Sequence, residues 1–173
     1  VDADNHPDLF WAIRGGGGNF GVVTHFKYRL HPVDTIVGGL LMLPATAEVI
    51  AALAAAAEAA PDELSTIVSI LPAPPLPFVP AEYHGQLVVM AMLAYIGEVE
   101  EGLRVVAPFR KLAEPIADMI GPMPYQQIYH TADGGDPFIF TLRSKFIDRV
   151  DVHAAQIILD HLNAATAPMR IAE

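Results

Sequence analysis

Four consecutive glycines, Gly15 to Gly18, interrupt the chain near its start. The preceding segment, 7–14, has the pattern of a short helix, with Pro7 at its first position and Asp8 where the helix dipole favours a negative charge. In the following segment, 21–33, apolar and polar side chains alternate with the period of two that is typical of a strand. Because glycine adopts positive φ freely, the run predicts a loop between this helix and this strand.

The loop matches the Gly-x-Gly-x-x-Gly pattern over Gly16 to Gly21. The dinucleotide-binding fingerprint needs a strand before the loop and a helix after it, and the order here is reversed, so a Rossmann site is excluded. A P-loop is excluded too, because no Gly-Lys-Ser/Thr follows. Two interpretations stay open. In the first, the bare backbone of the loop offers N–H groups to an anion or a flat ring. In the second, the loop packs tightly on neighbouring protein.

The composition limits the classes of partner. Ten Lys+Arg against twenty Asp+Glu give a net charge of −10, which argues against nucleic acid and anionic membranes as partners. The absence of cysteine excludes disulfides, Cys-ligated metals and thiol catalysis within this chain. The seven histidines show no metal-binding spacing, so we expect no metal site. With 53% hydrophobic residues and no apolar run near ~20 residues, the expectation is a soluble, cytoplasmic protein with a buried core.

From residue 35 onward the pattern predicts elements in the order β-α-β-β-α-β-α. The expected strands are 35–43, 64–71, 85–95 and 137–146, and the expected helices are 46–60, 98–112 and 152–165, with a helical turn at 124–129. Five prolines within 72–80 predict a loop. The first six elements correspond to an α+β fold, a ferredoxin-like antiparallel sheet with helices on one face. The boundary at 31–35 divides the chain into the parts 1–34 and 35–173.

The residues at the two ends of the chain suggest the interpretation that this sequence is a piece of a longer protein. The sequence starts with Val1, residues 1–5 have the pattern of a strand end running into a turn, and residues 167–173 stop without a cap. A short gene product that has lost its initiator methionine is the alternative.

The glycine run lies inside a longer block, Asp8 to Thr24, that reads DLFWAIRGGGGNFGVVT. This block closely resembles a signature of FAD-linked oxidases of the berberine bridge enzyme-like family, within the vanillyl-alcohol-oxidase superfamily. Weaker resemblances extend over the rest of the chain, at the segments 85–89, 95–97, 108–110 and 121–125. The resemblance implies that 1–34 ends an FAD-binding domain and that 35–173 is an incomplete substrate-binding domain.

The same resemblance implies roles for individual residues. The backbone that would contact FAD is that of Gly16, Gly17, Gly18, Asn19, Gly21, Val22 and Val23. The substrate candidates come from the residues themselves, as polar side chains of the expected sheet and turn: Gln86, Tyr95 and Tyr125. The first two lie on opposite faces of their strand, and only one face can point at the flavin. For Tyr125, a solvated helical turn is the alternative. The implied activity is oxidation of a small organic substrate (a sugar, an alkaloid or another secondary metabolite) by hydride transfer to flavin. The catalytic residue and the electron acceptor are left undetermined.

The sequence also departs from the family pattern. It has no Arg-x-Gly-Gly-His segment for the phosphates and no covalent-flavin cysteine, and the segment that carries a catalytic Tyr or Glu in the family is missing. The resemblance therefore predicts that this chain alone lacks FAD and activity, and that its partner is the missing FAD-binding half. Exposed strand edges predict a homo-oligomer, with disorder of residues 1–20 as the alternative. The alternative function is a stand-alone, non-catalytic ferredoxin-like binding or dimerisation domain.

Overall fold

The computed structural model describes residues 1–131, 141, 143–167 and 170–173. It divides into two compact units, Val1–Pro32 and Val33–Glu173, each of which is described here by itself. Their assignment to an FAD-binding and a substrate-binding domain, with the boundary at 34/35, stays a prediction.

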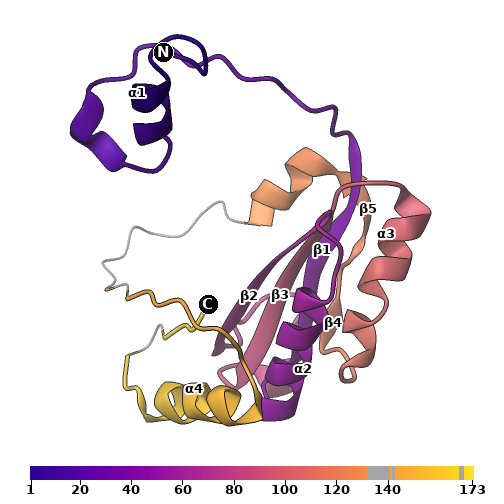
Figure 1. Ribbon diagram of the computed structural model, residues 1–173. Helices are drawn as coiled ribbons and strands as arrows, with labels where there is room; N and C mark the ends of the chain where they lie inside the picture. The colour runs from indigo at the N-terminus through magenta and orange to yellow at the C-terminus, as the bar shows by residue number, and fades with distance from the viewer. Residues whose placement is uncertain (132–140, 142, 168–169) are drawn as a thin grey trace. The chain divides into compact units, whose positions relative to one another are not determined.

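The larger unit is built on an antiparallel sheet (Figure 1). Its three long strands are β1 (Thr35–Pro44), β2 (Leu64–Pro72) and β3 (Leu87–Tyr95), and they lie in the order β2-β3-β1. Two short strands, β4 (Ala117–Asp118) and β5 (Gly121–Pro124), pair with the free side of β1. The expected α+β class with an antiparallel sheet is confirmed.

The strand beside β1 differs from the one predicted. Half of the expected strand 137–146, residues 137–140 and 142, falls outside the described residues, and residues 141 and 143–146, which are described, form no strand. The position beside β1 is occupied instead by β4 and β5. The sequence of β5, Gly-Pro-Met-Pro, is not typical of a strand. Proline cannot donate to a ladder, but an edge strand tolerates it because its outer N–H groups need no partner. The short 3₁₀ segment η4 (Tyr125–Thr131) follows β5 where the helical turn was expected.

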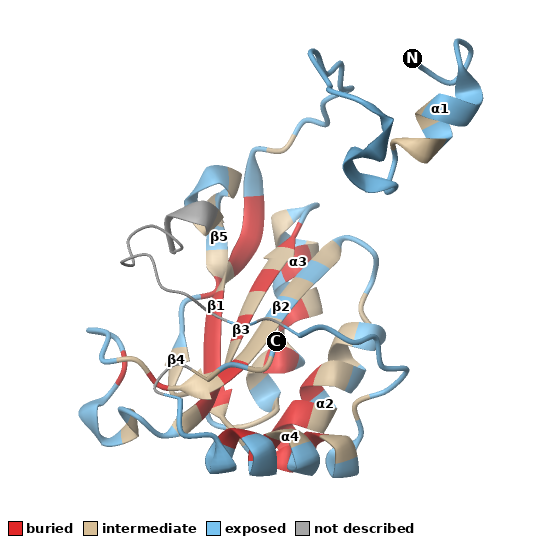
Figure 2. Cartoon of the chain, turned by 90° about the vertical axis from the view of Figure 1, so that its left-hand side faces the viewer, coloured by how far each residue is buried: buried red, intermediate tan, exposed pale blue. Residues whose placement is uncertain are grey.

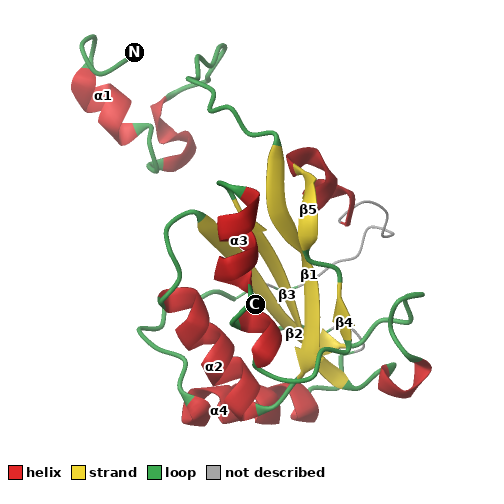
Figure 3. Ribbon diagram, turned by 90° about the vertical axis from the view of Figure 1, so that its right-hand side faces the viewer, coloured by secondary structure: helices red, strands yellow, loops and turns green. Residues whose placement is uncertain are grey.

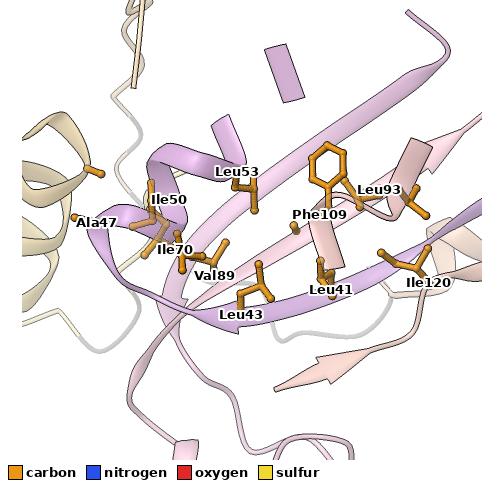
Figure 4. Close-up of a cluster of buried hydrophobic side chains, with 14 of the residues drawn as sticks. Leu41, Leu43, Ala47, Ile50, Leu53, Ile70, Val89, Leu93, Phe109 and Ile120 are labelled. Atoms are coloured by element: carbon orange, nitrogen blue, oxygen red, sulfur yellow. The ribbon is translucent and has the colours of Figure 1, made fainter. Parts of the chain in front are cut away.

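Helices cover one face of the sheet (Figure 3). They are α2 (Ala47–Glu58), α3 (Val99–Val106), which is followed by the 3₁₀ turn η3 (Phe109–Lys111), and α4 (Val152–Ala164), which packs on α2. All three predicted helices are confirmed, and α3 ends just before Pro108, where a disturbance was expected. The core between helices and sheet includes Leu41, Val89, Leu93 and Phe109, each at most 1% exposed (Figure 4).

The opposite face of the sheet carries a smaller buried cluster. The proline-rich segment, which includes the 3₁₀ turn η2 (Ala81–Tyr83), packs against one end of this face. Ala73 and Val79 of this segment join Met42 and Val88 of the sheet, each at most 4% exposed. No α-helix of the described residues covers the rest of this face (Figure 2), which is called the open face below.

The smaller unit contains α1 (Pro7–Ala12) and the 3₁₀ turn η1 (Gly17–Phe20), and neither buries a residue. The strand expected over 21–33 is not formed, because residues 21–34 have no regular secondary structure. A strand is held by hydrogen bonds to a neighbouring strand, and among the described residues none pairs with this segment. In the described ranges, no helix is long and apolar enough to cross a membrane.

Candidate functional site

The glycine loop presents bare backbone. Gly15, Gly17 and Gly21 have φ values of 116°, 72° and 129°, a region that side-chain-bearing residues rarely adopt. A Cβ added at Gly17 or Gly18 would meet no atom within 4 Å. These two peptides are therefore free of steric cover within their own unit, so a ligand can approach them closely.

Gly16 has a different local role. A Cβ at this position would come within 2.3 Å of the carbonyl oxygen of Ala12 and 2.5 Å of Cε2 of Phe20. Close packing between α1 and η1 thus explains this glycine without a ligand. The loop accordingly contains both kinds of glycine that the sequence left open, one that packs (Gly16) and four with open space (Gly15, Gly17, Gly18 and Gly21).

The segment after the loop carries a row of exposed apolar side chains. Val22 is 92% exposed and Val23 is 53% exposed, and Phe26 and Tyr28 stack with their ring centroids 5.5 Å apart. Asn19, the remaining candidate for cofactor contact, lies within η1 and is also exposed. The seven cofactor candidates thus form one continuous stretch of exposed chain, 16–23.

The three substrate candidates do not gather at one place. Gln86 lies exposed before β3, with its side-chain Nε2 donating to the carbonyl of Glu82. Tyr125 begins η4, and its backbone N–H donates to the carbonyl of Asp34 at 3.0 Å. Tyr95 is only 6% exposed and belongs to the core under the helices, so it does not face the open side of the sheet.

Burial also affects the pKa of the Tyr95 phenol. Desolvation raises the pKa of its phenol above the ordinary tyrosine value, and the carboxylates of Glu101 and Glu63 raise it further. The phenol therefore stays protonated at neutral pH, as a packed core residue does.

The open face contains residues that the sequence did not single out as a site. Ser65, Ile67 and Ser69 of β2 alternate toward this face, beside Met90 and Met92 of β3. Ile67 is 52% exposed, and both methionines are partly exposed. The signal that could have located this face is the strand register, which a sequence pattern alone does not provide. Among the described residues, no cluster of His, Asp or Glu could hold a metal ion.

Comparison with known proteins agrees with the resemblance of the glycine block. No family model matches the chain. An FAD-linked oxidoreductase of Dictyostelium discoideum is 31% identical over 170 residues, which are 94% of this chain and 34% of the relative. The (R)-6-hydroxynicotine oxidase of Paenarthrobacter nicotinovorans is 28% identical over 127 residues, which are 72% of this chain and 26% of that enzyme.

A solved structure shares the fold. The crystal structure of 6-hydroxy-D-nicotine oxidase from Arthrobacter nicotinovorans matches with a TM-score of 0.62 and 24% identity, over 79% of this chain and 29% of that one. The chain belongs to the FAD-linked oxidoreductases of the vanillyl-alcohol-oxidase superfamily. It spans about a third of the length of the Dictyostelium relative, 34%. The narrower berberine bridge enzyme-like placement stays a prediction, and the alternative of a stand-alone, non-catalytic domain is not favoured.

Proposed function

We propose that this chain is part of an FAD-dependent oxidoreductase in which residues 16–23 form one wall of the flavin site and the open face of the sheet forms the substrate platform. The parent enzyme would oxidise a small organic substrate. The observation that carries the proposal is the open space at Gly17 and Gly18, within a chain whose relatives are named FAD-linked oxidoreductases.

The chemistry of the loop fits the cofactor. FAD presents an anionic pyrophosphate and a flat ring, and both are suited to backbone N–H groups without side chains in the way. Gly17 and Gly18 would admit either group, whereas a side chain at these positions would occupy the space. Residues 1–32 place no acidic side chain in the loop itself, which keeps it compatible with an anion.

The contribution of this chain's own residues to the reaction would be to position the substrate. When bound, FAD supplies the acceptor for a hydride that leaves a substrate carbon. The open face would hold the substrate and exclude water from it, because its partly exposed side chains are mainly aliphatic and thioether groups. Gln86 and Tyr125 stay proposed substrate contacts. Tyr95 also stays in the proposal, but its place under α3 favours an indirect role through the sheet.

The experiment that tests the proposal compares two proteins. The longest in-frame protein that contains this sequence should retain FAD through dialysis, and its flavin absorbance should bleach when a substrate is added without oxygen. The 173-residue chain should retain none, because one wall gives too few contacts to offset the entropy of holding FAD. A longer protein that folds but never binds flavin would contradict the proposal.

A further inference from the structure

The two edges of the sheet differ in how their outward-pointing backbone groups are satisfied. On the edge formed by β4 and β5, the residues whose backbone groups point away from β1 are Ile120, Pro122 and Pro124. The two prolines have no N–H to donate. The Ile120 N–H donates to the Asp118 carboxylate at 3.0 Å, and its carbonyl accepts from Arg110 at 2.6 Å. This edge is therefore protected against pairing with a further strand.

The opposite edge, formed by β2, is open (Figure 1). The Ile70 N–H donates to the carbonyl of Ala172 at 2.7 Å, and the Ile70 carbonyl accepts from the Ala172 N–H at 3.1 Å. Thr66 and Val68 point outward like Ile70, and no described residue pairs with them there. Before Pro72, β2 carries no proline and no charged side chain, which are the features that usually protect an edge. The backbone groups of Thr66 and Val68 are thus available to an extended segment.

The two sides of this open edge differ in charge. On the side of the open face, Glu63 continues the register of β2, and the Glu173 carboxylate accepts from the Ser69 hydroxyl at 3.4 Å. On the side of the helices, Leu64 and Val68 are apolar and pack against the core. A strand with one basic face and one apolar face therefore matches the edge of β2.

The segment 24–30 has this pattern. Apolar or hydroxyl-bearing residues alternate with basic ones, in the order Thr24, His25, Phe26, Lys27, Tyr28, Arg29 and Leu30. As a strand, the segment would carry the two sets on opposite faces. The rings of Phe26 and Tyr28 already stack, with centroids 5.5 Å apart, and they are 70% and 71% exposed. The segment contains no carboxylate, and within the described part of the chain no strand pairs with it.

We propose that the segment 24–30 of one copy of this chain adds as a strand to the outer edge of β2 in a second copy, with its basic face beside Glu63 and Glu173. The exchange is reciprocal, because each copy has one such segment and one such edge, and it closes as a two-fold dimer. Residues 16–23 take no part in it, so the pairing is independent of the flavin site proposed above.

Charge favours this arrangement over direct pairing of two β2 edges. Two antiparallel β2 strands would bring Glu63 of one copy toward the far end of β2 in the other, where Glu173 lies. Like charges opposite each other destabilise a strand pair. In a chain with a net charge of −10, Lys27 and Arg29 instead supply cations to the acidic side of the edge.

The buried area is sufficient for a specific but weak dimer. An aromatic side chain buries about 150–250 Å² when it is covered, so the four rings of a reciprocal dimer bury roughly 600–1,000 Å². The leucine side chains and the paired edges add to this area, which brings it to the ~1,200 Å² at which specific interfaces begin. We therefore expect a dimer that dissociates on dilution.

The test uses a spin label, which can be attached at one introduced position because the chain has no cysteine. The ¹⁵N-labelled wild-type chain is mixed with unlabelled Lys27→Cys chain that carries a nitroxide. We expect the amide signals of Thr66 and Val68 to lose more than half of their intensity, and those of Ile120 and Gly121 on the protected edge to keep theirs. Only a contact between copies produces this loss, because the spin-labelled chain itself is not observed.

A second sample distinguishes the other occupants of the edge. Here the isotope and the nitroxide are on the same chain, diluted in an excess of unlabelled wild type. Loss of the Thr66 and Val68 signals in this sample alone would assign the edge to the chain's own segment and overturn the proposal. A dimer in which neither signal is affected, an equal loss at Ile120, or a monomer at every concentration would overturn it as well.

A matched pair of double substitutions tests the orientation of the basic face. Exposed charges contribute little singly, so two are reversed together. Lys27→Glu with Arg29→Glu should weaken the dimer about tenfold in sedimentation, because favourable charge contacts with the edge become repulsive. Arg143→Glu with Lys145→Glu reverses two exposed cations at the same spacing and changes the net charge by the same amount, so it should leave the affinity unchanged. Equal weakening by the two pairs would overturn the proposed contact with Glu63 and Glu173.

Discussion

Gly102 of α3 lies directly against Tyr95 of β3, so that a Cβ at position 102 would come within 2.7 Å of the ring atom Cδ1. The same Cβ would be 2.8 Å from Cγ2 of Val37 in β1. A Cβ at Gly97 would be 2.7 Å from the ring atom Cε1 and 2.9 Å from the hydroxyl oxygen of Tyr95. Two glycines thus lie against Tyr95, and Gly102 lets α3 approach the helix-covered face of the sheet closely.

This contact predicts that Gly102→Ala destabilises the chain. Alanine raises helix propensity by about 1 kcal/mol, but overpacking against a ring and a β-branched side chain costs about 1–3 kcal/mol. We expect the free energy of unfolding in urea to fall. Gly121→Ala is the matched control, because a Cβ there meets nothing within 4 Å. A Gly102→Ala chain more stable than the wild type would show that α3 can shift away from Tyr95.

The N-terminus of α2 gives a second prediction. The Thr46 hydroxyl accepts a hydrogen bond from the N–H of Val49 at 3.2 Å, as expected of an N-cap. Thr46→Ala should lower the free energy of unfolding by about 1 kcal/mol, whereas Thr46→Ser, which keeps the acceptor, should change it little. Equal losses in both variants would assign the effect to the threonine methyl group instead.

The ion pair of Arg110 and Asp118 predicts a dependence on pH. The guanidinium donates to both carboxylate oxygens, at 2.6 and 3.1 Å, and also to the carbonyl of Ile120 at 2.6 Å. Burial alone would raise the pKa of Asp118, but the Arg110 hydrogen bonds and charge, with the Ile120 N–H, hold it below its ordinary value. A folded-state pKa below the unfolded one stabilises the fold above that unfolded value, about 3.9, and the contribution is lost as pH falls through the folded pKa.

Asp118→Asn should therefore lower the free energy of unfolding by about 1–3 kcal/mol at pH 7, and the difference from wild type should shrink below about pH 4. The control is Glu101→Gln, because Glu101 pairs with Arg104 in an exposed setting, with side chains 46% and 72% exposed. Such pairs contribute about 0–1 kcal/mol. A difference for Asp118→Asn that stays constant down to pH 2 would contradict the assigned role of its charge.

The unpaired segment after the glycine loop predicts self-association of this chain. Val22, Phe26 and Leu30 are 92%, 70% and 85% exposed, in a segment that has no regular secondary structure. We expect a homo-oligomer, most simply a dimer, that covers this apolar row. Sedimentation velocity should show dissociation when Phe26 and Leu30 are replaced by serine. Lys27→Ser, which removes no apolar side chain, should have no effect, and a wild-type monomer at all concentrations would contradict the prediction.

Most helices and loops of the larger unit could be predicted from the sequence, because the residues that determine them lie close together along the chain. The cap at Thr46, the alanine-rich helix after it and the proline-rich loop each follow from residue types at fixed spacing. Strand pairing is not local. A strand was expected at 137–146, whereas the segments that pair with the free side of β1 are Ala117–Asp118 and Gly121–Pro124, and the latter has no β-rich pattern.

The candidate site was predictable only in part, for the same reason. The glycine block could be recognised from its composition alone. The structure adds which glycines pack against neighbouring atoms and which have open space at the Cβ position. Alternation put Gln86 and Tyr95 on opposite faces of the expected strand, but the sequence did not indicate which face the helices cover. That choice depends on the inward sides of α2 and α3, which enclose Tyr95 and leave Met92 partly exposed.

The central claim, that the loop lies against FAD, is tested most directly by three substitutions in the longest in-frame protein. Gly18→Val adds a side chain in open space without a positive φ to strain. Gly17→Ala and Gly85→Ala are matched, since their φ values are 72° and 78° and neither Cβ meets an atom within 4 Å. Their strain costs should be similar, about 1 kcal/mol.

The measurement is the FAD content of each purified variant, with its melting temperature in the flavin-free form. The account predicts that Gly18→Val and Gly17→Ala lose flavin while Gly85→Ala keeps it, and that Gly18→Val melts like the wild type once flavin is removed. Full FAD occupancy with unchanged affinity in Gly18→Val would contradict the claim.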